Sequence, residues 1–229
     1  MKHIRRENNF SLIPLIGDFT YALSKIVDKL FSPFGTKTPI RFSEFSEDWQ
    51  AYSYSQILEV SNERNTDNSV TNILSASQVH GMIERDKIDI DIKFDKSSTK
   101  TYKIVHPGDY VVHLRSFQGG FAFAKQKGIC SPAYTILRPK PMLEFSFLTE
   151  YFVSEKFIQQ LKMVTYGIRD GRSINVEDFL KLHILLPSRQ EQKKLKSVIA
   201  VLNDKLFQSD ALLSLLQSQK KYLLRHLFI

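Results

Sequence analysis

Two glycine-containing loops carry the residue types that proteins use to read DNA, namely arginine, glutamine and serine. In the major groove, arginine makes two hydrogen bonds to guanine and glutamine makes two to adenine, whereas serine and backbone N–H groups hold phosphates. Together with one lysine that follows the first loop, these loops supply the candidate DNA contacts Arg115, Ser116, Gln118, Lys125, Arg169, Arg172 and Ser173. An ordinary pair of solvated loops is the alternative interpretation.

Charge along the chain favours the same chemistry. The chain has a net charge of +8, and residues 100–140 hold seven basic side chains but one acidic side chain, Asp109. A basic block in mid-chain is typical of a phosphate-binding face. Basic surfaces also serve solubility, so charge alone does not decide between DNA and another partner.

The sequence patterns that could indicate a catalytic site are weaker than the pattern of candidate DNA contacts. Ser131-Pro132-Ala133-Tyr134 is similar to the loop with which amino-methyltransferases hold a flipped base, but the second proline is missing. No glycine-rich loop follows a predicted strand, so we expect no S-adenosylmethionine site in this chain. Asp109 with Glu191 and Lys193 imitates a nuclease site loosely, and Glu191 is better explained as a helix cap.

Metal and thiol chemistry are not predicted either. The six histidines show no pair spaced four residues apart, and a single cysteine cannot form a zinc signature. Cys130 has no activating neighbour in the sequence and is expected to be a small buried residue. We therefore predict no catalytic residue and no metal ligand.

Composition sets the broad class. At 229 residues and 42% hydrophobic content, the chain can bury one sizeable core and carry an appendage. One cysteine excludes a disulfide framework, and no run of eighteen apolar residues predicts a membrane span. A cytoplasmic protein is expected.

Hydrophobic periodicity predicts a body of the α/β or α+β class between two helical ends. Residues 10–31 have helical spacing, and Tyr110–Leu114 is the strongest strand candidate. The other predicted strands are Asp89–Lys93, Thr101–Val105, Phe121–Ala124 and His183–Leu186, and Gly128–Leu137 is a further strand region. Phe145–Val164 is a further helical segment, and Asn175–Leu180 is a short helical or turn segment.

The C-terminal segment predicts a long coiled-coil helix. Ser188 and Glu191 fit a capping box, and neither proline nor glycine occurs after Ser188. Apolar residues then recur at alternating steps of four and three, in a seam formed by Leu195, Ile199, Leu202, Leu206, Leu213, Leu216, Leu223 and Leu227. Such a repeat calls for a partner helix, either from a second copy or from within the chain, over roughly 60 Å. Packing of the seam on the chain's own body is the alternative.

Several short motifs resemble the specificity (S) subunit of type I restriction-modification enzymes. The resemblance extends over residues 37–229 and is strongest where the body leads into the long helix. The segments that carry it are Pro39–Phe45 with Trp49, Gly128–Tyr134, Arg172–Phe179, Leu185–Ser188 with Glu191-Gln192, and Lys220–Phe228.

This resemblance implies three parts: an N-terminal helical segment at 1–36, a target recognition domain at 37–187, and a spacer and dimerisation helix at 188–229. S subunits usually carry two recognition domains and two long helices that pair antiparallel, so this chain resembles a half subunit. Two copies joined along the seam would restore the usual architecture and read a target with symmetric halves.

The implied function is a non-catalytic, sequence-specific DNA-recognition subunit. It would read one half-site of a bipartite target in double-stranded DNA and dock methyltransferase and restriction subunits. S-adenosylmethionine would be bound by the partner modification subunit, and this chain would hold no cofactor. The alternative is a dimeric coiled-coil scaffold with a basic body that does not read DNA sequence.

Overall fold

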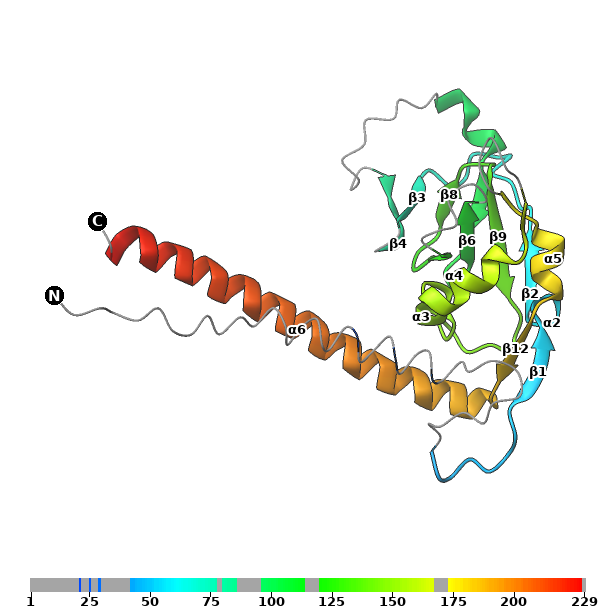
Figure 1. The fold of residues 1–229 in the computed structure, drawn as a ribbon. Helices are drawn as coiled ribbons and strands as arrows, with labels where there is room; N and C mark the ends of the chain where they lie inside the picture. The colour runs from blue at the N-terminus through cyan, green and yellow to red at the C-terminus, as the bar shows by residue number, and fades with distance from the viewer. Residues whose placement is uncertain are drawn as a thin grey trace. The chain divides into compact units, whose positions relative to one another are not determined.

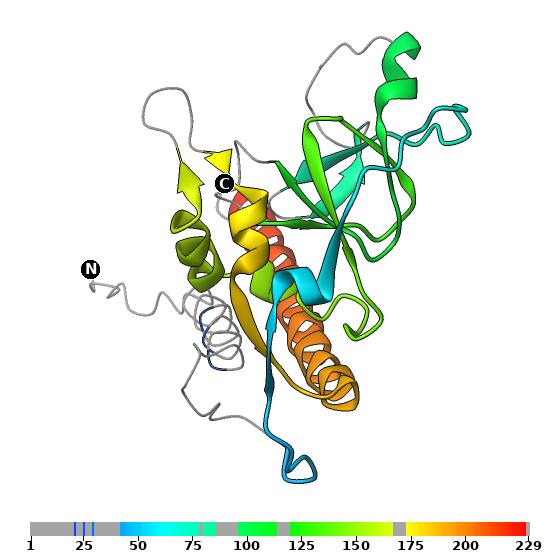
Figure 2. The same ribbon diagram turned by 90° about the vertical axis from the view of Figure 1, so that its right-hand side faces the viewer.

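The computed structural model describes residues 21, 25, 29, 42–77, 80–85, 96–113, 120–166 and 173–227 (Figures 1 and 2). The chain divides into two compact units. One is Val27–Lys194, and the other combines Met1–Ile26 with Leu195–Ile229. The predicted part boundaries at 36/37 and 187/188 remain predictions. Within the described segments, no helix has both the length and the apolar character to cross a membrane.

A four-stranded antiparallel sheet forms the centre of the larger unit. In order across the sheet, its strands are β2 (Leu58–Ser61), β9 (Tyr134–Pro139), β6 (Tyr110–His113) and β7 (Ala122–Phe123). Strand β6 lies between β9 and β7, and its first three residues are buried. Burial on both faces explains why this segment is a continuous apolar run rather than an alternating one.

Among the described residues, four shorter antiparallel pairs form separate two-stranded sheets. They are β5 (Lys103–Val105) with β8 (Gly128–Cys130), β3 (Leu74–Ser77) with β4 (Gly81–Glu84), β1 (Gln50–Ser53) with β12 (His183–Leu186), and β10 (Thr165–Tyr166) with β11 (Ser173–Ile174). Isolated bridges join Ile73 to Ile129 and Met82 to Ala124. The β3–β4 hairpin is therefore attached to the segment that runs from β7 to β8.

The described helices of the larger unit are short. They are α2 (Tyr54–Ile57), α3 (Thr149–Phe152), α4 (Glu155–Lys162), α5 (Val176–Lys181) and the 3₁₀ helix η2 (Lys96–Thr101). The C-terminal helix α6 (Arg189–Leu227) is much longer. The Asn175 side chain accepts the N–H groups of Glu177 and Asp178 and so caps α5. The Ser154 hydroxyl caps α4 in the same way, accepting the Phe157 N–H.

Aromatic rings pack the short helices together. Tyr54 of α2 stacks on Phe179 of α5 with ring centroids 4.4 Å apart. Phe121, at the entry to β7, has ring centroids within 5.0–5.2 Å of Phe152, Phe157 and Phe179. All five side chains are buried, and edge-to-face pairs of this kind stabilise a core beyond the area that they bury. Contacts distant in the sequence thus hold α2, α3, α4 and α5 around one centre.

The sequence predicted most of these elements. The mixed helix and strand class with a long C-terminal helix is confirmed. The predicted strand region Gly128–Leu137 contains the two strands β8 and β9, because a turn closed by Tyr134 N–H to Ser131 O separates them. Phe145–Val164 holds two short helices instead of one, with a break at Val153. The predicted strand Asp89–Lys93 and most of helix 10–31 lie outside the described residues.

Replacing Gly120 by alanine is expected to lower the free energy of unfolding by about 3 kcal/mol. Gly120 has a φ of +77°, and a Cβ there would overlap the carbonyl oxygen of Phe152. Gly108→Ala is the matched control, since Gly108 also has positive φ but a Cβ there would meet only the Phe145 ring. We expect a loss of about 1 kcal/mol for the control in urea unfolding. Equal losses would contradict the assigned clash.

Candidate nucleic-acid interface

The predicted DNA contacts fall mostly outside the described residues. This holds for Arg115, Ser116, Gln118, Arg169 and Arg172. The remaining two are visible: Lys125 is exposed on the turn between β7 and β8, and Ser173 is half-buried in β11, opposite Tyr166 of β10. All seven assignments remain predictions.

The described residues of the basic block at 100–140 do not form one charged face. Lys103 is nearly buried and donates from Nζ to the carbonyl of Tyr134 at 2.8 Å. Lys140 donates to the carbonyl of Ser55 at 2.7 Å, and Arg138 binds two carboxylates. Three of the basic residues thus stabilise the fold, which the sequence pattern could not reveal. Lys100, Lys125 and Lys127 are exposed and offer charge to a partner.

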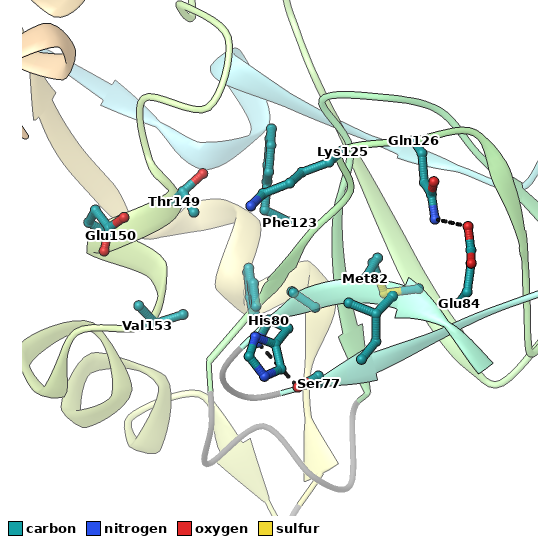
Figure 3. Close-up of a pocket in the computed structure, with 14 residues that line it drawn as sticks. Ser77, His80, Met82, Glu84, Phe123, Lys125, Gln126, Thr149, Glu150 and Val153 are labelled. Carbon is teal, nitrogen blue, oxygen red and sulfur yellow. Dashed lines mark hydrogen bonds between the residues drawn. The ribbon is translucent and has the colours of Figure 1, made fainter. Parts of the chain in front are cut away.

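A pocket of about 660 Å³ lies beside Lys125 (Figure 3). Three segments line it: the β3–β4 hairpin, residues 121–126, and α3 with Val153. Its apolar wall includes Met82, Phe121 and Phe123. Its polar groups are Ser77, His80, Glu84, Lys125, Gln126, Thr149 and Glu150. Such a mixture suits a ligand with a flat apolar face and hydrogen-bonding edges.

Sequence reasoning missed most of this pocket. Glu84 and Gln126 are more than forty residues apart, yet Gln126 Nε2 donates to Glu84 Oε1 at 3.2 Å. The bridge between Met82 and Ala124 brings their segments together. Neither residue stands in a motif, so the one available signal was the position of Gln126 between two lysines.

A buried carboxylate lies just before β6, where the Asp109 backbone pairs with Ala124 at the end of β7. Asp109 accepts the His106 N–H at 2.8 Å through Oδ2 and Arg138 Nε at 3.1 Å through Oδ1. Arg138 also contacts Glu63 at 3.3 Å, and His106 Nε2 lies 3.0 Å from the same Glu63 carboxylate. The four residues Asp109, Arg138, Glu63 and His106 are called the Asp109 network below.

Electrostatics within this network favour a structural role. Partial burial raises the pKa of Glu63, but hydrogen bonds and charge from His106 and Arg138 outweigh it and hold that pKa below 4.5. The bond to Asp109 is the main cause that raises the pKa of the Arg138 guanidinium. A glutamate held ionised in this way is a poor general base at neutral pH. Burial also raises the pKa of the Cys130 thiol to about 12, which leaves it unreactive, as predicted.

The described residues do not form a candidate metal site. Among the residues that the structure describes, no three or more His, Cys, Asp or Glu side chains are grouped so that they could hold an ion.

The first turn of α6 forms hydrogen bonds with residues 142–144 and 187–188. Ser188 Oγ accepts the Glu191 N–H at 3.3 Å, which is one half of the predicted capping box. The buried Gln192 side chain accepts the Glu144 N–H at 2.9 Å and donates to the carbonyls of Met142 and Pro187. Lys194 adds an ion pair to Glu44 and lies over the Phe42 ring. Glu191 therefore belongs to the capped start of the helix, and Gln192 binds residues 142–144 to it.

Burial along the predicted seam decreases toward the C-terminus. Leu195 and Ile199 are buried, Leu202, Leu206 and Leu213 are half-buried, and Leu216 and Leu223 are exposed. The Leu227 side chain is not described. Further apolar side chains stand exposed around the helix, namely Val198, Val201, Phe207, Leu212, Leu215, Tyr222 and Leu224. So much uncovered apolar surface is typical of an interaction surface.

Comparison with known proteins begins with two negative results. No protein-family model matches the chain, and no curated protein matches its sequence. Solved structures do resemble it. An HsdS subunit from Thermoanaerobacter tengcongensis aligns with a TM-score of 0.59 at 15% identity, over 88% of this chain and 47% of that one.

Two further solved structures also resemble the chain. A chain from a study of complex assembly and conformational transition of the type I restriction-modification system gives a TM-score of 0.59 at 16% identity, over 93% of this chain and 50% of that one. The type I restriction-modification S subunit from M. genitalium gives 0.55 at 14% identity, over 95% and 56%. The resemblance to S subunits is thereby confirmed at the level of the fold, and the chain spans about half the length of these neighbours.

Removing Arg138 is expected to destabilise the fold by about 2–3 kcal/mol, because Asp109 would stay buried without its cation. Arg138→Leu should show this loss in urea unfolding. The double variant Arg138→Leu with Asp109→Asn should recover part of it, since the asparagine still accepts the His106 N–H without a buried charge. A double variant less stable than Arg138→Leu would contradict the assignment.

Acid is expected to erase the contribution of Glu63. Because its folded-state pKa lies below the value of 4.5, the stability that it adds is present above pH 4.5 and disappears as the pH falls through the lowered pKa. Wild type should therefore exceed Glu63→Gln in unfolding free energy at pH 7, and this difference should shrink as the pH is lowered below 4.5. Asp204→Asn, on the exposed face of α6, is the control. A difference between wild type and Glu63→Gln that stays constant as the pH is lowered from 7 through the acid range would refute this role.

Proposed function

We propose that this chain is a DNA sequence-recognition subunit of a type I restriction-modification system. The observation that carries the proposal is the similarity of its fold to S subunits over 88–95% of its length. The match includes the long C-terminal helix as well as the mixed body. The subunit itself would be non-catalytic, and S-adenosylmethionine would be bound by the methyltransferase partner.

The larger unit would read one half-site of a bipartite target. Its predicted contacts follow described strands in the sequence: Arg115, Ser116 and Gln118 come after β6, which ends at His113, and Arg169 and Arg172 stand between β10 and β11. Loops on such a scaffold can vary in sequence without disturbing the core.

Helix α6 would set the separation between half-sites and dock partner subunits. Its 39 residues correspond to a length of about 60 Å. The exposed side chains of Leu216 and Leu223, on the seam, and of Leu212, Leu215 and Tyr222, beside it, give it more than one apolar stripe. A helix that contacts several partners at once would need such a distribution. We propose that one of these partners is a second copy of the chain.

The recognition role is tested by producing the chain with and without a methyltransferase partner and mapping methylated bases across the genome of the host. A defined two-part motif should appear only when this chain is present. Alanine at Arg115 and at Arg172 should each weaken DNA binding and reduce the slope of log affinity against log salt by about 1 where a phosphate contact is lost. If no motif is methylated and both variants bind like wild type, a scaffold protein is the better account.

Self-association is tested by measuring molar mass in solution with light scattering. Leu216→Asp combined with Leu223→Asp should convert a dimer to a monomer, because buried carboxylates in a helix seam are not tolerated. Ala211→Asp combined with Ser218→Asp is the matched control, since both residues are exposed and lie off the seam. A wild-type monomer at micromolar concentration would exclude the homodimer, and dissociation by the control would exclude this seam as its interface.

A further inference from the structure

The turn Lys125-Gln126-Lys127, here called the Lys-Gln-Lys turn, has a fixed backbone. On its N-terminal side, Ala124 is fully buried, donates its N–H to the Asp109 carbonyl at 2.9 Å and accepts the Gly108 N–H at 2.8 Å. On its C-terminal side, the Lys127 carbonyl accepts Asn72 Nδ2 at 3.1 Å. Hydrogen bonds to segments distant in the sequence therefore fix both ends of the turn, and its three side chains project from a well-fixed backbone.

Glu84 determines how the Gln126 amide is oriented. A carboxylate can only accept hydrogen bonds, so Gln126 must direct Nε2 toward Glu84 Oε1, at 3.2 Å. Figure 3 shows this pair at one side of the pocket, with Lys125 projecting from the same turn in the other direction. Among the described residues, Gln126 makes no other hydrogen bond. One N–H and the carbonyl oxygen of its amide remain for a ligand.

These two remaining groups match one base edge better than the others. Adenine offers N7 as an acceptor and its N6 amino group as a donor, which fits one N–H and one C=O side by side. Guanine offers two acceptors at the same edge, and its O6 would face the amide oxygen. Because Glu84 opposes rotation of the amide, Gln126 cannot simply turn over to accept guanine.

Lys125 supplies the charge that such a contact needs. It is exposed, and within the described residues it forms no ion pair. A lysine next to a base-reading side chain can hold a backbone phosphate and fix the register of the duplex. Lys127, also exposed, stands on the other side of Gln126.

We propose that Gln126, oriented by Glu84, reads an adenine of the DNA target, and that Lys125 binds a neighbouring phosphate. This inference rests on the proposed function, because it assumes that the chain reads DNA. It adds a specificity-determining pair that the basic loops do not contain. Glu84 acts through Gln126 and is a positioning residue.

The test uses the full chain with its methyltransferase partner and the target motif obtained by mapping methylation. Binding is measured for the target duplex and for duplexes in which each base pair of the motif is changed in turn. Gln126→Ala should reduce discrimination at one A·T pair by about tenfold or more and leave the salt slope unchanged. Gln126→Glu should lose the same discrimination, because it removes the N–H that adenine N7 accepts.

Companion variants separate positioning from charge. Glu84→Ala should weaken discrimination at the same base pair, whereas Glu84→Gln keeps an acceptor for Gln126 and should retain most of it. Lys125→Ala should weaken binding to all duplexes alike and lower the salt slope by about 1. Gln159→Ala and Lys162→Ala, on the exposed face of α4, are matched controls that should behave as wild type.

The outcomes distinguish the two levels of the proposal. If wild type shows no sequence preference, the recognition function itself fails. If wild type discriminates but Gln126→Ala and Gln126→Glu discriminate equally well, the recognition function stands and this inference is overturned. Loss of discrimination that is spread evenly over all base pairs, with a lowered melting temperature, would assign Gln126 a purely structural role and would also overturn it.

Discussion

The buried carboxyl group of Asp109 is the interaction on which the larger unit depends. Its two oxygens bind Arg138 of β9 and the backbone of His106, and its own carbonyl binds Ala124 at the start of the Lys-Gln-Lys turn. One residue therefore connects the β5–β6 turn, the central sheet and the edge of the pocket. A buried charge is tolerated only where every lone pair finds a partner, so this residue also restricts how its neighbours can move.

Much of the fold could be predicted from the sequence because its signals are local. The apolar run at Tyr110 gave β6, and the Ser188 and Glu191 pair gave the start of α6. The segment Asn175–Leu180, expected to be a short helix or turn, corresponds to α5. The strand region expected at 128–137 contains two strands, since apolar content does not show where a turn interrupts it. The break after α3, by contrast, does have a local signal, because the Ser154 hydroxyl caps the start of α4 by accepting the Phe157 N–H.

The candidate site was less predictable for a different reason. Charge counts placed seven cations at 100–140, yet Lys103, Arg138 and Lys140 bind carbonyls or carboxylates of their own chain. Whether a lysine faces solvent or a carbonyl depends on strand pairing between distant segments, which one sequence does not reveal. The pairing of Glu84 with Gln126 has the same origin, because it requires the bridge from Met82 to Ala124.

The buried thiol of Cys130 gives the chain a built-in reporter. It is the one cysteine of the chain, has no exposed surface, and ionises so weakly that a disulfide reagent added at neutral pH would find almost no thiolate. Modification therefore requires that β8 separate from β5. The rate of thiol labelling would then measure how often this part of the sheet opens, without any added probe and in the presence of DNA or partner proteins.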